Sequence, residues 1–142
     1  IIPTLICQFL SDTHIIKIGN HKPTRDFVYV KDTVKGFIEI AKSDSLLGEE
    51  INIATNSEIS IKELIDKISN ILKIQKEIEY ENIRLRPEKS EVFRLFGSNE
   101  KILHHTNWQP YYTIDKGLEE TINWFKINKN LDLYKYYNTY NY

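Results

Sequence analysis

Apolar residues recur along this chain at the i, i+3, i+4 and i+7 spacing of amphipathic helices. The first such stretch predicts a helix over residues 1–10, where Pro3 is tolerated because it falls in the first turn. A later stretch predicts a helix after Ser60, which forms an S-x-x-E capping box with Glu63. The residues expected to face inward on these two helices are Ile1, Ile2, Leu5, Ile6, Phe9 and Leu10, and Ile61, Leu64, Ile65, Ile68, Ile71 and Leu72.

Three further helices are expected between and after these segments. Asp32 is placed to cap a helix that runs to about residue 41, Ser98 a short helix to about residue 104, and Thr113 a last helix. Trp108 is expected to anchor the last helix by packing. The inward residues expected are Val34, Phe37, Ile38 and Ala41 on the first of these helices, and Ile114, Leu118, Ile122 and Phe125 on the last.

Short runs of β-branched and aromatic residues between the helices predict strands at 14–20, 27–30, 50–54 and 78–83. Strands that alternate with helices are typical of the α/β class, so we expect an α/β fold. The strand at 50–54 (EINIA) is nearly all apolar, like strands that are covered on both faces of a parallel sheet. Since no nearby segment is equally apolar, we expect part of its sheet to lie outside this chain.

Composition narrows the class of protein. The 142 residues suffice for one domain with a sizeable core, with 41% hydrophobic and 27% charged residues. A formal net charge of −1 argues against a nucleic-acid-binding module, and no apolar run approaches the roughly 20 residues of a membrane span. Cys7 lies among apolar neighbours and fits a small core residue in a protein of the reducing cytoplasm. The sequence has no methionine, so we expect residue 1 not to be the natural start.

The candidate chemistry of the chain centres on arginines. Arg25 stands at the start of a predicted strand, and Arg84 and Arg86 alternate in an extended segment that Pro87 favours. Together these three guanidinium groups are suited to bidentate contacts with a diphosphate. The alternative is that each arginine pairs with a nearby carboxylate. The available partners are Asp26, Glu88 and Glu91.

Two acidic residues accompany the arginines. Glu91 is a candidate for accepting hydrogen bonds from a ribose diol, and the alternative is a salt bridge to Arg86 or Arg94. Asp26, beside an apolar run, is expected to satisfy buried backbone donors. The histidines lack metal-ligand spacing, and the chain has no G-x-S-x-G, Walker or G-x-G-x-x-G motif. We therefore assign no catalytic, cofactor-binding or metal-binding residue to this chain.

Four segments in order carry a family resemblance: RDFVYVKDTVKGF, EEINIATNSEISIKEL, RLRPEKSEV and NWQPYYTIDKGLEETINWF. They resemble the C-terminal half of extended short-chain dehydrogenase/reductases that act on nucleotide sugars. Within that family, GNHKPTRDFVYVKD is similar to the GDP-mannose 4,6-dehydratases. RLRPEKSEV resembles the N-acetylglucosamine-nucleotide 4,6-dehydratases still more closely.

The resemblance implies roles for five residues. Arg25, in the R-D-aromatic motif, would contact the nucleotide diphosphate, and Arg86, before a proline, would be a second arginine at the same group. Glu91 would lie near the ribose. Ile16 and Lys17, on the strand that runs along the base and ribose, would be neighbours of the nucleotide.

The resemblance also implies the C-terminal part of a longer enzyme. Residues 1–128 would form the nucleotide-sugar-binding region, and residues 31–55 within it would pack with a cofactor domain outside this chain, as a late strand and helix of that domain's Rossmann sheet. Residues 129–142 form a Tyr-rich tail, either a mobile end or a docking segment. The family's glycine-rich loop and Tyr-x-x-x-Lys catalytic pair belong to its N-terminal half, which binds NAD or NADP.

The implied activity is the 4,6-dehydration of a nucleotide-diphosphate sugar by a cytoplasmic homodimer of the full-length protein. This fragment alone is expected to be inactive, and no membrane or nucleic-acid partner is expected. Two alternatives stay open at this point: a nucleotide-sugar 4-epimerase on the same scaffold, and a non-catalytic domain that binds nucleotides or partners.

Overall fold

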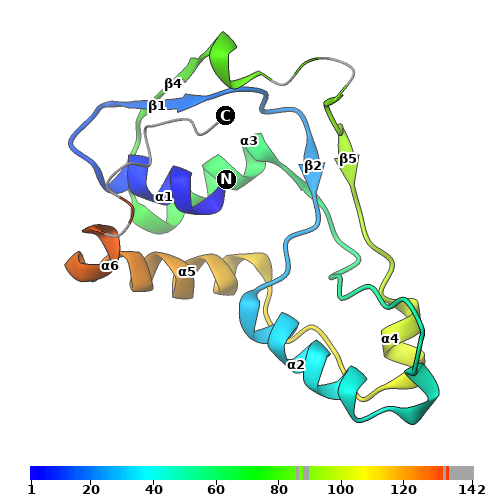
Figure 1. Ribbon diagram of the computed structural model, residues 1–142. Coiled ribbons are helices and arrows are strands. Elements are labelled where there is room, and N and C mark those ends of the chain that lie inside the picture. Colours follow the sequence, from blue (N-terminus) through cyan, green and yellow to red (C-terminus); the bar gives the residue numbers. More distant parts are fainter. Residues whose placement is uncertain (86, 88–89, 133, 135–142) are drawn as a thin grey trace. The chain divides into compact units, whose positions relative to one another are not determined.

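The computed structural model describes residues 1–85, 87, 90–132 and 134, and these divide into two compact units (Figure 1). The first unit is built from Ile1–Pro23, Ser60–Phe93 and the described residues from Leu118 onward. The second unit is built from Thr24–Ile59 and Arg94–Gly117. Each unit is described by itself below.

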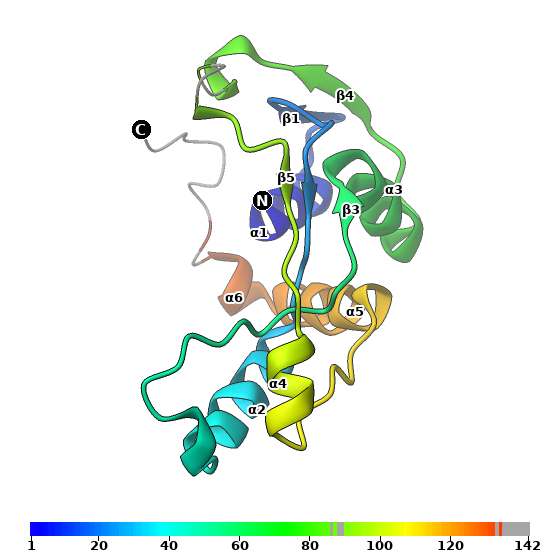
Figure 2. The same cartoon turned by 90° about the vertical axis from the view of Figure 1, so that its right-hand side faces the viewer.

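The first unit packs helices against a parallel pair of strands. Strand β1 (Ile15–Ile18) pairs with β4 (Glu77–Tyr80), and helix α1 (Ile2–Leu10) packs against β1 and against α3 (Ile61–Leu72). Figures 1 and 2 show α1 and α3 side by side on one face of the β1–β4 pair. The apolar core of this unit consists of Leu5, Ile6, Cys7, Phe9, Ile16, Ile18, Ile61, Leu64, Ile65, Ile68, Leu118, Ile122 and Phe125.

Helices α1 and α3, which have the clearest sequence signals, form as predicted. Pro3 lies in the first turn of α1, as predicted. Ile1, which was expected to face inward, is the N-cap of this helix and is half exposed. Ser60 caps α3, because its Oγ accepts a hydrogen bond from the Glu63 N–H while the Glu63 carboxylate accepts one from the Ser60 N–H. The capping box is therefore confirmed. Such reciprocal bonds satisfy two of the four N–H groups that a helix start leaves unpaired.

The free edge of β1 is closed by a side chain. The Gln8 amide, almost fully buried, accepts a hydrogen bond from the Lys17 N–H (2.7 Å) and donates one to the Lys17 carbonyl (3.2 Å). It thus replaces a neighbouring strand for one residue, which matters because unpaired edge groups invite other strands. The strand expected at 78–83 is shorter than predicted, since β4 ends at Tyr80 and a 3₁₀ turn (Asn82–Arg84) follows.

The second unit contains a small sheet and two helices. Strand β2 (Thr24–Arg25) pairs in parallel with β5 (Arg94–Leu95), in a sheet of order β3-β2-β5 that includes β3 (Ile59–Ser60). Chain segments lead from β2 into α2 (Val30–Ala41) and from β5 into α4 (Glu100–His105), as Figure 1 shows. A 3₁₀ turn (Asp44–Leu46) follows α2. The buried residues of this unit are Asp32, Leu46, Ala54, Asn99, Ile102 and Trp108.

The strand predicted at 27–30 is wrong. The ladder is confined to Thr24–Arg25, and the one later bond to it runs from the Asp26 N–H to the Leu95 carbonyl (3.0 Å). The partner strand β5 is equally short, so residues beyond 26 have no ladder to join, and α2 begins at Val30. Asp32 is not the N-cap of α2 either; Tyr29 is, without a side-chain cap.

The strand predicted at 50–54 is also absent, because no described segment pairs with it. The segment instead runs between elements of the second unit. A Cβ at Gly36 of α2 would lie 2.7 Å from Ile53 Cδ1, so a larger residue there would require the Ile53 side chain to shift. On the other side, Asn99 Nδ2 donates to the Ala54 carbonyl (3.0 Å).

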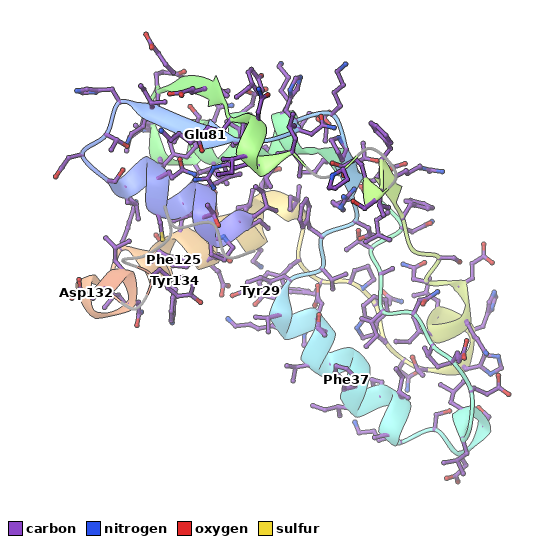
Figure 3. All side chains as sticks on the ribbon, turned by 45° about the horizontal axis from the view of Figure 1, so that its top comes forward. Tyr29, Phe37, Glu81, Phe125, Asp132 and Tyr134 are labelled. Carbon is purple, nitrogen blue, oxygen red and sulfur yellow. The ribbon has the colours of Figure 1, made fainter. Side chains whose placement is uncertain are left out.

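The face of α2 that was expected to point inward is exposed. Val34, Phe37 and Ile38 are 51%, 65% and 48% exposed, and Phe37 is labelled in Figure 3. The buried face of the helix holds Asp32 and Gly36 instead. Hydrophobic periodicity correctly predicts that α2 has an apolar face, but the described residues provide nothing that covers it.

The C-terminal helices follow the prediction with small shifts. Asn99 rather than Ser98 is the N-cap of α4, and α5 (Ile114–Phe125) begins after Thr113, whose Oγ1 accepts from the Lys116 N–H (3.3 Å). A short helix, α6 (Asn128–Asp132), was not predicted. Its end is followed by Tyr134, whose ring lies 4.9 Å from that of Phe125 (Figure 3). Of the Tyr-rich tail, residues 133 and 135–142 lie outside the described residues. None of the described helices is long and apolar enough to span a membrane.

Candidate functional site

Arg25 lines a cavity of about 360 Å³ within the second unit. It is the only charged residue among the described residues of the lining, and one of its guanidinium nitrogens donates to the Thr24 carbonyl (2.7 Å). The polar part of the lining carries hydroxyl groups, on Thr55, Ser57, Tyr111, Tyr112 and Thr113. The apolar part consists of Phe27, Ile59, Pro110 and Ile114. One positive charge among hydroxyl and apolar groups suits an anionic group attached to a larger, partly apolar molecule.

Asp26 holds the chain segment that contributes Thr55 and Ser57 to the lining of this cavity. Its carboxylate accepts hydrogen bonds from the Thr55 N–H (3.0 Å), the Thr55 hydroxyl (2.6 Å) and the Asn56 N–H (3.0 Å). Asn56 has a φ of 58°, in the left-handed region, so these bonds stabilise a turn that the backbone alone disfavours. Asp26 therefore satisfies backbone donors, as predicted, but the donors are part-buried at Thr55 and exposed at Asn56 rather than buried.

Glu58 holds the other end of the same turn. It accepts hydrogen bonds from the Thr24 hydroxyl (2.5 Å) and from the Arg94 guanidinium, with an Nη2–Oε1 distance of 2.6 Å. The bonds from Arg94 and then Thr24 keep the pKa of the Glu58 carboxyl below its ordinary value. Arg94, considered above as a partner of Glu91, thus forms its ion pair with Glu58.

Asp32 organises the loop that supplies the remaining wall, a role that the sequence did not reveal. It is fully buried, and one carboxylate oxygen accepts hydrogen bonds from the N–H groups of Tyr111 (3.0 Å) and Tyr112 (2.8 Å). Its backbone carbonyl accepts the indole N–H of Trp108 (2.9 Å), so Trp108 is buried against α2. The signal was ambiguous, because an acidic residue in the first helical turn is favourable whichever way it points.

A Tyr-x-x-x-Lys spacing occurs in this chain after all, at Tyr112 and Lys116. Tyr112 precedes α5 and its ring packs 4.4 Å from that of Tyr29. The Lys116 ammonium lies over the rings of Tyr111 (4.2 Å) and Tyr112 (5.1 Å). These are cation–π contacts with ring faces, which indicates packing at the start of α5.

In the first unit, one carboxylate joins two of the candidate cations. Glu81, labelled in Figure 3, accepts from the Lys17 ammonium (2.8 Å) and from Arg84 Nε (2.5 Å). These two bonds lower the pKa of the Glu81 carboxyl, and the same pairing raises the pKa of Lys17. For Arg84 the alternative of a carboxylate partner therefore holds, although the partner is one that the sequence analysis had not named.

The other predicted site residues differ in how far they are buried and in whether the structure describes them. Ile16 is fully buried in the first unit, so its side chain has no surface with which to contact a ligand. Lys17, on the opposite face of β1, and Glu91 are half-buried in the same unit. Arg86 lies outside the described residues. Since Arg25 belongs to the second unit, its convergence with Arg86 on one diphosphate stays a prediction.

A larger cavity of about 820 Å³ lies elsewhere in the second unit, at the C-terminal half of α2. Its charged groups include the ion pair of Lys42 with Glu39 (2.8 Å), and none of the five predicted site residues lines it. The smaller cavity is the stronger candidate, because a guanidinium group among hydroxyl groups suits one class of ligand, whereas size alone does not.

Metal and dinucleotide sites find little support in this chain. Among the described residues, no three histidine, cysteine or carboxylate side chains are grouped as metal ligands. The five glycines of the sequence do not form a G-x-G-x-x-G loop, so the residues present do not fit the pyrophosphate of NAD or NADP.

Comparison with known proteins identifies the family. The family model for GDP-mannose 4,6-dehydratase matches residues 1–121. Human dTDP-D-glucose 4,6-dehydratase is 29% identical over 133 residues, which cover 90% of this chain and 37% of that protein. UDP-glucuronate 4-epimerase from Thermodesulfobacterium geofontis is 33% identical over 119 residues, covering 82% of this chain and 35% of the epimerase.

Solved structures give the same result. The structure of dTDP-glucose 4,6-dehydratase from Bacillus anthracis, in complex with NAD, superposes with a TM-score of 0.77 at 26% identity. The match covers 92% of this chain and 40% of that one, so the chain spans about two fifths of its relatives. The family resemblance is therefore confirmed: the chain belongs to the extended short-chain dehydrogenase/reductases, in the family of NAD-dependent nucleotide-sugar epimerases and dehydratases.

Proposed function

We propose that this chain is the nucleotide-sugar-binding portion of an NAD(P)-dependent nucleotide-sugar 4,6-dehydratase. The observation that carries the proposal is Arg25: it stands in the family's R-D-aromatic motif and lines a cavity that holds no other charged side chain among the described residues. A guanidinium group in such a cavity can form paired hydrogen bonds to a phosphate. The match to the GDP-mannose 4,6-dehydratase family model favours a dehydratase.

In this proposal the chain supplies binding and orientation of the nucleotide sugar rather than the reacting groups. The nicotinamide cofactor would provide hydride transfer when bound, and its site would lie in an N-terminal part of the full-length protein, as the family resemblance implies. Arg25, with Arg86 as its expected partner, would fix the diphosphate and so the position of the sugar.

The exposed face of α2 supports a covering domain. Val30, Val34, Phe37 and Ile38 are each about half exposed or more, while the opposite face of the helix is buried through Asp32 and Gly36. A helix with one apolar face in water and another in the protein is one that a second layer normally covers. We propose that residues 31–55 pack against the cofactor-binding domain, which would also cover the segment at 50–54.

The test is nucleotide-sugar binding by the full-length protein. Arg25→Ala should weaken the binding of UDP-, GDP- or dTDP-sugars by about 1.5 to 3 kcal/mol, as for loss of a hydrogen bond to a charged group. Lys62→Ala, which removes an exposed cation in the first unit, is the matched control and should leave binding unchanged. Titration calorimetry that gives the same affinity for Arg25→Ala and wild type would contradict the proposal.

A 4-epimerase on the same scaffold is the second candidate, favoured by the 33% identity to the Thermodesulfobacterium geofontis epimerase. NMR of the reaction products of the full-length protein separates the two. A dehydratase yields a 4-keto-6-deoxy sugar, whereas an epimerase yields the C4 epimer with its C6 substituent retained.

A further inference from the structure

The residues directly before and after Arg25 both form hydrogen bonds to the turn at residues 55–58. Asp26, directly after the arginine, binds the first part of the turn through Thr55 and Asn56. Thr24, directly before the arginine, binds the last part through Glu58, at 2.5 Å. Two residues that flank a cavity-lining cation therefore both fix the same four-residue turn.

Ser57 lies between these two anchors. It lines the Arg25 cavity, and within the described part of the chain its hydroxyl takes part in no hydrogen bond, while its carbonyl accepts from the Thr55 hydroxyl (3.3 Å). The neighbouring hydroxyl of Thr55 donates to Asp26, whereas that of Thr113 accepts the Lys116 N–H and keeps its own proton to donate. Ser57 is thus a cavity hydroxyl with its donor available and its backbone position fixed.

We propose that Ser57 is a second ligand-binding residue of the Arg25 cavity, and that it donates a hydrogen bond to a phosphate oxygen of the nucleotide diphosphate. This inference rests on the proposed function. The Arg25 charge selects an oxyanion, and a hydroxyl held in place by two anchors adds a directed donor at little entropic cost. Three hydrogen bonds hold the Asp26 carboxylate to Thr55 and Asn56.

Asp26 and Thr24 then act as positioning residues. Their side chains do not need to touch the ligand, since they place Ser57 by holding residues on either side of it. In this arrangement the arginine of the Thr-Arg-Asp sequence binds the ligand, and its two neighbours hold the turn that contributes Ser57 to the cavity lining.

The experiment measures binding of UDP, GDP and dTDP to the full-length protein by titration calorimetry, with uridine, guanosine and thymidine as phosphate-free probes. Ser57→Ala should weaken binding of the preferred diphosphate about ten-fold, the loss expected for one hydrogen bond to a charged acceptor. Its affinity for the corresponding nucleoside should not change. Ser45→Ala, at an exposed serine in the 3₁₀ turn of the same unit, is the matched control.

Ser57→Asp places a carboxylate where a phosphate oxygen is expected and should abolish measurable diphosphate binding. Diphosphate affinity equal to wild type in Ser57→Ala, or retained in Ser57→Asp, would overturn the inference, as would an equal loss for the nucleoside. If wild type binds none of the diphosphates, the proposed function itself fails. If wild type binds and only Arg25→Ala weakens binding, the proposed function stands and the role of Ser57 does not.

Discussion

Asp32 offers the sharpest test of how the second unit is held together. Replacing it with alanine removes a fully buried carboxylate that accepts hydrogen bonds from the Tyr111 and Tyr112 N–H groups, at 3.0 and 2.8 Å. Each N–H that loses its partner costs about 1 to 3 kcal/mol. Part of this loss is offset, because the other carboxylate oxygen is buried without a hydrogen bond among the described residues, and its removal relieves a desolvation cost of similar size.

The net destabilisation expected for Asp32→Ala is therefore about 1 to 3 kcal/mol. Asp32→Asn keeps an amide oxygen as acceptor and should cost less, about 1 kcal/mol. The assay is urea unfolding of the full-length protein, followed by tryptophan fluorescence, to which Trp108 contributes; its indole N–H is bonded to the Asp32 carbonyl. Asp44→Ala, at an exposed carboxylate in the same unit, is the control.

The loop from Pro110 to Ile114 also lines the Arg25 cavity, so Asp32→Ala should weaken diphosphate binding in addition to lowering stability. Unfolding midpoints that coincide for Asp32→Ala, Asp44→Ala and wild type would refute the argument. A loss of binding without a loss of stability would show that Asp32 contacts the ligand rather than the loop.

Three further predictions concern other parts of the fold. Gly19→Ala should destabilise the protein by about 1 to 3 kcal/mol, seen as a lower thermal midpoint, because the new Cβ would overlap the Arg84 carbonyl oxygen of the close-packed first unit. Phe37→Ser in the full-length protein should cost about 1.5 to 3 kcal/mol if a second domain covers α2, whereas exposed Ile83→Ser should not; equal midpoints would argue against the covering domain. Burial raises the pKa of the Cys7 thiol to about 11, above its ordinary value of 9.0, so the protonated form is favoured by folding and stability should fall as pH rises between these values. Iodoacetamide should accordingly label Cys7 only after unfolding, and rapid labelling of the folded protein at neutral pH would contradict its burial.

The sequence predicted well whatever depends on neighbours within a few residues. The Ser60–Glu63 capping box, the first-turn proline of α1 and the buried positions Leu118, Ile122 and Phe125 of α5 all formed as expected. The backbone donors that Asp26 satisfies were also anticipated in kind, although their identity was not. Such features follow from helix geometry and from the cost of leaving a buried polar group unpaired.

The tertiary structure alone decided the partners of the charged groups. Asp32 binds Tyr111, 79 residues away, Glu58 binds Arg94, 36 residues away, and Lys17 binds Glu81, 64 residues away. The sequence had favoured other partners for these groups, because a sequence shows only which residues are neighbours along the chain. The family resemblance identified Arg25, but only the tertiary structure shows the hydroxyl groups that line the same cavity, including that of Ser57.

What the sequence determined by itself is therefore the helices, their apolar faces and the family, since local geometry and motif spacing fix these. It could not determine which apolar face is buried or where a strand finds a partner: α2 exposes the face that its pattern marks as inward, and residues 50–54 form no strand. Hydrophobic periodicity records that a surface needs covering, while the covering surface comes from elsewhere in the fold, and only the tertiary arrangement shows whether it is there.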